Sequence, residues 1–262
     1  MNRLMYVLLR MIGLARPGPK TRFQRAMRRF ERVFLGVALA YGGLQVFPQV
    51  LFAYSVSDGG MTLYARHPLS ARAAERLAQA RVLVDRSELA VPDRRERIFL
   101  CDSPWLFRVF APSSPRAFAI STPLTDNIFI AGADVAADLA TSQASDHPTR
   151  SFTGVIAHEA THGLIRRRLG FWRMLRLPTW VEEGYCDYIA REGSFPDAEG
   201  RRLFVDGRKL TSASFRYYKY RQMVAYLVDG RHLSFGEVAG QAREADSVER
   251  EAREALRSRG IR

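Results

Sequence analysis

The sequence predicts an α+β domain that follows an N-terminal transmembrane helix. Three observations support this class: an uncharged stretch at residues 33–54, short β-branched and aromatic segments between residues 97 and 131, and segments with helical spacing from residue 152 onward. We therefore expect three parts, and the length of the last part suits one folded domain. They are a basic segment at residues 1–32, a transmembrane helix at 33–54 and a domain at 57–262.

The expected membrane helix has the sequence VFLGVALAYGGLQVFPQVLFAY, which contains no charged residue. About 20 apolar residues span a bilayer. Gln45, Pro48 and Gln49 weaken the prediction, although proline is tolerated in membrane helices. A cleaved signal peptide is one alternative, but its basic region would be long and residues 53–55 form a poor cleavage site. A helix buried in a soluble core is the other alternative.

The charge distribution gives this helix an orientation. Residues 1–32 contain nine Lys and Arg residues and one acid, a net charge of +8 out of the chain's +13. Cations resist translocation, so we expect the N-terminus to stay in the cytoplasm and residues 57–262 to lie outside, close to the membrane. This predicts a single-pass bacterial inner-membrane protein with an extracytoplasmic, periplasmic domain. The remaining charge of +5 is ordinary, so no nucleic-acid partner is expected.

The elements of the domain follow from spacing and from residues that begin or end helices. A strand at residues 97–101 and a hairpin formed by residues 117–121 and 127–131 are expected after a first helix that Ser70 caps. Cys101 and Cys186 are not expected to form a disulfide. The predicted helices are residues 70–88, 152–170, 179–192, 215–229 and 242–259.

The predicted helix at residues 152–170 carries the motif HEATH at residues 158–162. Residues four apart share one face of a helix, so His158 and His162 can bind the same zinc ion. Glu159 lies beside that position and can take a proton from a metal-bound water. The neighbouring residues are uncharged, which favours a buried site over a surface helix with two solvated histidines, the competing interpretation.

The next predicted helix supplies a third ligand within the segment WVEEGYCD at residues 180–187. Thr179 and Glu182 have the spacing of a capping box, which assigns Glu182 to the helix start. Glu183 is then free to bind zinc, and a fourth position stays open for water. Asp187 shares its face and is a candidate to accept a hydrogen bond from a ligand histidine. The competing interpretation is an ordinary acidic stripe.

These two motifs resemble those of the gluzincin metallopeptidases, especially the peptidase MA-like domains. The resemblance is specific over about residues 153–191 and implies a zincin-like fold with a small mixed sheet and two motif helices. It implies zinc ligands at His158, His162 and Glu183, and a general base at Glu159. The metzincin pattern is excluded, because Ile165 and Arg168 stand where it needs glycine and histidine.

The resemblance also implies an edge strand that holds an extended peptide, for which Asn127–Ala131 is the candidate. It implies a tyrosine or histidine that stabilises the oxyanion; Tyr217, Tyr218, Tyr220 and His232 are in range, and spacing favours Tyr218. The expected activity is hydrolysis of peptide bonds in a peptide or protein substrate by a membrane-anchored zinc peptidase. The alternative is a membrane-anchored protein of interaction or assembly in which zinc serves folding alone.

Overall fold

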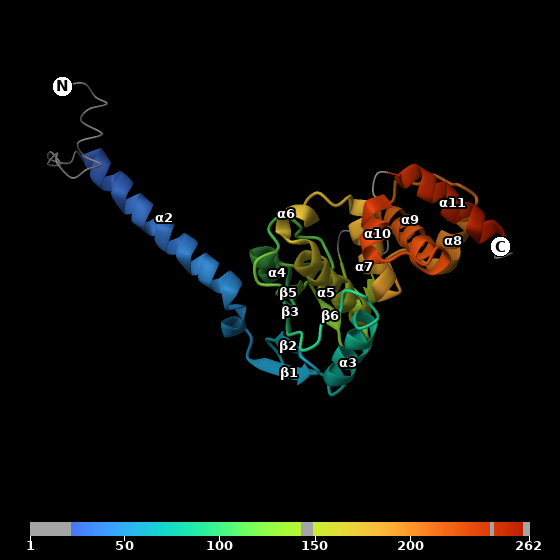
Figure 1. Ribbon diagram of the computed structural model, residues 1–262. Helices are drawn as coiled ribbons and strands as arrows, with labels where there is room; N and C mark the ends of the chain where they lie inside the picture. The colour runs from blue at the N-terminus through green and yellow to red at the C-terminus, as the bar shows by residue number, and fades with distance from the viewer. Residues whose placement is uncertain (1–21, 143–148, 242–243, 259–262) are drawn as a thin grey trace, which may run out of the picture. The chain divides into compact units, whose positions relative to one another are not determined.

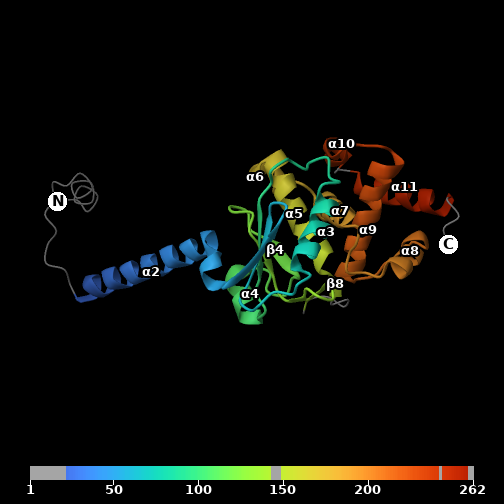
Figure 2. The ribbon, with the colours of Figure 1, turned by 90° about the horizontal axis from the view of Figure 1, so that it is seen from below.

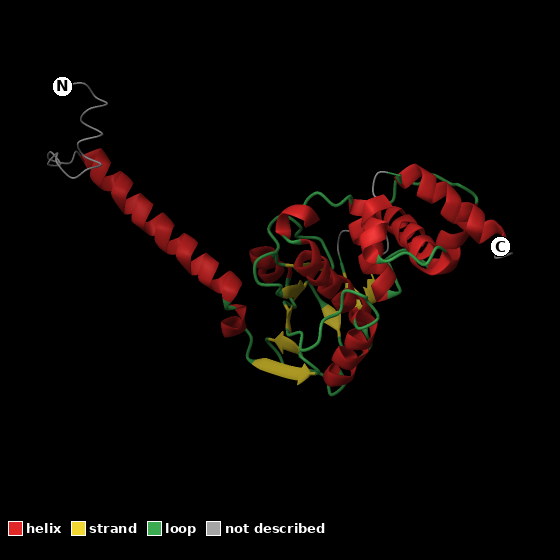
Figure 3. Ribbon diagram, in the orientation of Figure 1, coloured by secondary structure: helices red, strands yellow, loops and turns green. Residues whose placement is uncertain are grey.

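The computed structural model describes residues 22–142, 149–241 and 244–258 (Figure 1). The chain divides into two compact units, Met1–Pro48 and Gln49–Arg262. The division lies before the predicted start of the folded domain at Ser57, which falls inside the first strand, β1 (Tyr54–Asp58). The mixture of helices and strands in the second unit agrees with the α+β part of the predicted class (Figure 3).

The first unit contains one described helix, α2 (Arg22–Val46). It begins eleven residues before the predicted span, within the arginine-rich segment, and it ends before Pro48, which lacks a backbone N–H and begins the 3-10 turn η1 (Pro48–Leu51). The uncharged stretch is therefore shared among a helix, a turn and the start of β1. None of the helices in the described part of the chain has the length and apolar composition for a membrane span. The predicted single-pass, inner-membrane placement is wrong.

The larger sheet of the second unit has the strand order β1-β2-β3-β5-β4. Its centre is parallel, since β3 pairs in parallel with both β2 and β5, while β1 and β4 are antiparallel to their neighbours. The β4–β5 hairpin confirms the predicted one. The bounds of the remaining strands are β2 (Met61–Ala65), β3 (Glu96–Leu100), β4 (Ala119–Ser121) and β5 (Ile128–Ile130).

The two faces of this sheet carry different cores, because alternate strand residues point to opposite sides. Ile98 and Ile128 belong to the aliphatic core that packs with helices α3 (Ala73–Val84) and α5 (Phe152–Leu169). On the other face, the ring of Phe129 stacks on Phe99 at 5.1 Å and on Phe110 of helix α4 (Pro104–Phe110) at 4.1 Å. Figure 2 shows α4 on the side of the sheet away from α3. Helix α5 is thus fixed against a rigid layer.

A small antiparallel sheet leads directly into α5. Its strands are β6 (Ala133–Asp134), β7 (Leu139–Thr141) and β8 (Thr149–Ser151). The last residue of β8, Ser151, caps α5 by accepting a hydrogen bond from the backbone N–H of Gly154 at 2.8 Å. The helix ends at Gly170, whose φ of 77° suits glycine. The predicted bounds of this helix are confirmed.

Helices form the rest of the unit, and those from residue 179 onward lie together in Figure 1. Helix α7 packs closely on α9: a β-carbon on Gly184 would lie 2.6 Å from the carbonyl oxygen of Tyr220, so only glycine permits this approach. The elements are α6 (Phe171–Met174), α7 (Thr179–Ala190), α8 (Asp197–Val205), α9 (Ala213–Ala225), the π-helical turn η2 (Tyr226–Gly230), α10 (Phe235–Gly240) and α11 (Ala245–Ser258).

Two details of the prediction are corrected here. The edge strand of the large sheet is β4 and not Asn127–Ala131, whose strand β5 lies between β3 and β4. Helix α7 ends at Ala190, two residues before the predicted end at residue 192, with Arg191 in the left-handed conformation, φ 60°. Both depend on tertiary packing, which the local pattern does not contain.

Candidate metal centre

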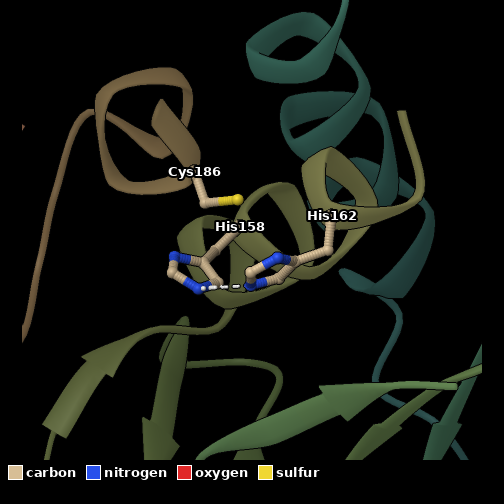
Figure 4. Close-up of side chains that lie close together, drawn as sticks. All are labelled: His158, His162 and Cys186. Atoms are coloured by element: carbon tan, nitrogen blue, oxygen red, sulfur yellow. Dashed lines mark hydrogen bonds between the residues drawn. The ribbon is translucent and has the colours of Figure 1, made fainter. Parts of the chain in front are cut away.

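Helix α5 brings the two motif histidines to one buried face. His158 is 8% exposed, and the side chain of His162 is nearly as well covered. Their Nε2 atoms lie 3.2 Å apart, and both come from the same turn of helix (Figure 4). Two nitrogens that bind one tetrahedral zinc at about 2.0–2.1 Å lie about 3.3 Å apart. The imidazoles therefore have the separation that a shared zinc ion requires.

Each histidine has a carboxylate on its other ring nitrogen. Nδ1 of His158 lies 2.7 Å from Oδ1 of Asp187, and Nδ1 of His162 lies 2.9 Å from Oε1 of Glu182. Such carboxylates orient metal-binding histidines and fix their tautomer, which leaves Nε2 free for the metal. Asp187 lies where the sequence predicted it. The capping box is wrong, because Pro178 precedes α7 without a side-chain cap and Glu182 faces His162 instead.

Asp187 is itself held by a buried arginine. Nη2 of Arg150 donates to its Oδ1 at 3.0 Å, and Nε of Arg150 lies 3.4 Å from Glu192. Burial alone would raise the pKa of Asp187, but the charges of Arg150 and His158 outweigh burial and hold this pKa below its usual value. Burial likewise opposes protonation of His158, yet Asp187 raises the pKa of His158 to about 10. Asp187 is therefore a carboxylate fixed on His158.

Glu192 completes this support at the start of α5. Its carboxylate accepts hydrogen bonds from the backbone N–H of Ser151 at 3.1 and 3.3 Å. A side chain on Gly154 would collide with that carboxylate, which accounts for glycine at this position. A negative charge at a helix N-terminus is favourable. Arg150 and Glu192 were not predicted, since neither lies in the two motifs; each is joined to the site only through folding.

Glu183 lies on the side of the Nε2 atoms, as the sequence predicted. Its Oε2 is 3.3 Å from Nε2 of His158, and its Oε1 is 3.9 Å from Nε2 of His162. Burial would raise the pKa of Glu183, but the hydrogen bond to His158 and the charge of His162 lower it. An ionised carboxylate thus lies beside two imidazole nitrogens, and these three groups are candidate ligands of one metal ion.

Cys186 is a competing third ligand. Within the described residues, ligand atoms of His158, His162 and Cys186 lie within 4.8 Å of one another (Figure 4). Cys186 is a free cysteine, fully buried in the apolar cluster beneath α7, and burial together with nearby carboxylates raises the pKa of its thiol well above the usual value. We favour Glu183 because it faces the same cleft as the two histidines and Cys186 does not.

That cleft has a volume of about 720 Å³, and His158, His162 and Glu183 lie along it. Edge strand β4 contributes one wall, and Val155 and Met174 add apolar surface. Glu159 also lines the cleft and is 8% exposed. Among the described residues its carboxylate makes no hydrogen bond or ion pair, so it is available to a small molecule beside the metal position. Glu159 thus lies where the sequence predicted a general base.

Tyr218 does not share this position. It is 1% exposed within an aromatic cluster with Phe195 and Phe215, and its hydroxyl donates to the backbone oxygen of Asp197 at 3.3 Å. The adjacent Tyr217 lines the cleft instead. Burial and the negative charge of Glu183 raise the pKa of Tyr217, which keeps its hydroxyl a donor. The helical register of α9 turns Tyr218 into the core, so this part of the prediction is corrected.

Comparison with protein-family models and with curated proteins finds no match to this chain. The interpretation of the site therefore depends on its own geometry. His158, His162 and Glu183 fit zinc in donor chemistry and spacing, and the carboxylates on both Nδ1 atoms are those that zinc-binding histidines use.

Proposed function

We propose that this chain is a zinc-dependent peptidase whose metal ligands are His158, His162 and Glu183. The observation that carries the proposal is the pair of imidazoles with Nε2 atoms 3.2 Å apart, each with a carboxylate on Nδ1, on the wall of an open cleft. A structural zinc site is closed by four protein ligands, whereas three ligands leave a position for water. The three-ligand set beside a cleft favours catalysis.

Glu159 acts as the general base in this proposal. Zinc, when bound, polarises the scissile carbonyl and lowers the pKa of a water molecule toward about 7. Glu159 accepts the proton of that water and transfers it to the nitrogen that leaves as an amine. Asp187 and Glu182 hold the two imidazoles in orientation throughout, and Arg150 keeps Asp187 ionised.

Edge strand β4 and Tyr217 supply the remaining parts. Among the described strands β4 pairs only with β5, so its other backbone edge faces the cleft and can pair with an extended peptide. The hydroxyl of Tyr217 can donate a hydrogen bond to the oxygen that becomes negatively charged as water attacks. Peptide bonds present both an extended backbone and such an oxygen, which supports a peptide or protein substrate.

The metal is tested by elemental analysis of the purified full chain. We expect one zinc per chain, loss of zinc in His162→Ala and Glu183→Ala, and retention of zinc in Cys186→Ala. Glu183→Ala and Cys186→Ala are a matched pair, since each removes one candidate third ligand from α7. Loss of zinc in Cys186→Ala with retention in Glu183→Ala would replace our ligand set with the one containing cysteine.

Catalysis is tested with Glu159→Gln on a mixture of peptides of known sequence, with products detected by mass spectrometry. The variant should keep its zinc and lose about 10²–10⁴-fold in rate, the usual contribution of a general base. Cleavage by Glu159→Gln at the wild-type rate would refute this mechanism. If the zinc-loaded wild-type chain cleaves no peptide, the alternative of a non-catalytic zinc protein is favoured.

A further inference from the structure

Arg166 extends the metal helix into the cleft. It lies four residues after His162, on the same face of α5, and both side chains line the cleft. Residues at this spacing have β-carbons about 5–6 Å apart. An extended peptide advances about 3.3 Å per residue, so a group held by Arg166 would belong to a residue within about three positions of the bond at the metal.

The guanidinium of Arg166 is fixed by Asp126 in the turn between β4 and β5. Its Nε and Nη2 atoms donate to Oδ1 of Asp126 at 2.9 and 2.6 Å. The remaining nitrogen, Nη1, makes no hydrogen bond or ion pair among the described residues. A rigid guanidinium with a free donor is well suited to bind a carboxylate.

The positive charge of Arg166 is only partly neutralised by the residues around it. Asp126 is shared, since Nη2 of Arg167 lies 3.0 Å from its Oδ2. Arg167 also lies 3.6 Å from Glu96, which pairs with Arg94 at 3.1 Å. Three arginines thus meet two carboxylates, and burial raises the pKa of Glu96 to about 7, which weakens the negative side further. Arg166 is the only one of these five residues that lines the cleft.

The other charged groups of the cleft near the metal already have roles. Glu182 and Glu183 face the two histidines, Glu159 is the proposed base, and Arg150 is paired with Asp187 and Glu192. Arg116 also lines the cleft, but it is exposed, whereas Arg166 is buried and lies four residues after His162 on the same helix. The excess positive charge at Arg166 is therefore the one that a substrate meets beside the metal position. A substrate that carries a carboxylate would neutralise it.

We propose that Arg166 is a specificity-determining residue that selects substrates with a carboxylate within about three positions of the bond that is cleaved. This inference rests on the proposed peptidase function. The carboxylate can come from an aspartate or glutamate side chain or from the free C-terminus of the peptide, since a guanidinium binds both in the same way.

The test measures binding to the zinc-loaded full chain, so it does not depend on turnover. The probes are short peptides that carry a hydroxamate at the C-terminal end, or at the N-terminal end through a succinyl group, because hydroxamates bind zinc and place the peptide on one side or the other. Each position is compared as Asp against Asn and Glu against Gln. A free C-terminus is compared with its amide in the second series, which separates the two sources of the carboxylate.

We expect at least one acidic probe to bind about tenfold or more tightly than its neutral partner. Arg166→Gln should remove that preference, and Arg166→Lys should keep part of it. Arg167→Gln is the matched control: it also loses an ion pair with Asp126, yet it does not line the cleft. It should keep the full preference. Thermal unfolding of both glutamine variants checks that each is folded.

The outcomes separate the two proposals. If acidic and neutral probes bind equally well, Arg166 has no such role while the metal site stands. If Arg166→Gln and Arg167→Gln lose the preference for acidic probes equally, the preference depends on the ion pairs with Asp126 and not on Arg166 in the cleft. That result would overturn the inference. If no hydroxamate binds, or the chain does not take up zinc, the proposed function fails and this inference fails with it.

Discussion

Each of the two histidines of the site pairs with a carboxylate, but the two carboxylates differ in burial and in their own partners. His158 pairs with Asp187, which is 2% exposed in its side chain and is also bound to the buried Arg150. His162 pairs with Glu182, whose side chain is 21% exposed and lines the cleft. One histidine is therefore fixed by a buried ion network and the other by a single carboxylate at the solvent. In the proposed zinc site we therefore expect His158 to anchor the metal and His162 to adjust.

The largest expected effect is that of Asp187→Ala. It leaves Arg150 buried beside Glu192 alone and removes the acceptor of His158. Breaking a buried ion pair costs about 3–5 kcal/mol of stability. Loss of the carboxylate on a ligand histidine lowers metal affinity about 10–100-fold. Chemical denaturation and zinc titration against a chelator would measure both, and normal values for both would refute the anchoring role.

A smaller and different effect is expected from Gly184→Ala. The added carbon meets the backbone of Tyr220, which cannot move without moving α9. Overpacking of this kind costs about 1–3 kcal/mol. Zinc affinity should change little, because the added carbon faces α9 and not the histidines of α5. The position of Tyr217 on α9 and the rate of peptide cleavage should change. If Gly184→Ala lowers zinc affinity as much as Asp187→Ala does, zinc affinity depends on the placement of helix α7 and not on the carboxylate of Asp187.

Glu182→Gln tests the second pair, that of His162 with Glu182. Glutamine keeps the size of the side chain and can still accept a hydrogen bond from His162 through its amide oxygen. We expect stability within about 0.5 kcal/mol of the wild type, as for most surface changes. Zinc affinity should fall by less than about tenfold. The comparison fails if Glu182→Gln weakens zinc binding more than Asp187→Asn does under the same conditions.

The pH dependence of the zinc-free chain compares the two pairs without the metal. Asp187 raises the pKa of His158 to about 10 in the folded protein, against about 6.5 in an unfolded chain. The protonated imidazole therefore stabilises the fold fully below about pH 6.5, and this contribution is lost as the pH rises toward 10. The Tm measured with a chelator present should fall over that interval. Asp187→Asn should reduce this dependence of Tm on pH more than Glu182→Gln does. An equal reduction in both variants would contradict the conclusion that the His158–Asp187 pair is stronger than the His162–Glu182 pair.

Short-range spacing in the sequence predicts the parts of the site that lie within one helix. His158 and His162 share a face because four residues make about one helical turn, and Glu183 and Asp187 share a face of α7 for the same reason. The helix from Phe152 to Leu169 and the β4–β5 hairpin follow from local periodicity and caps, and the structure contains both.

Tertiary structure alone decided how these pieces meet. Because α7 packs on α5, the carboxylate of Glu182 pairs with His162 and does not cap its own helix. The register of α9 buries Tyr218 and places Tyr217 at the cleft. The order of the strands made β4 the edge of the sheet. Each outcome depends on packing between residues far apart in the chain, whose free energy exceeds the preferences that a local pattern reports.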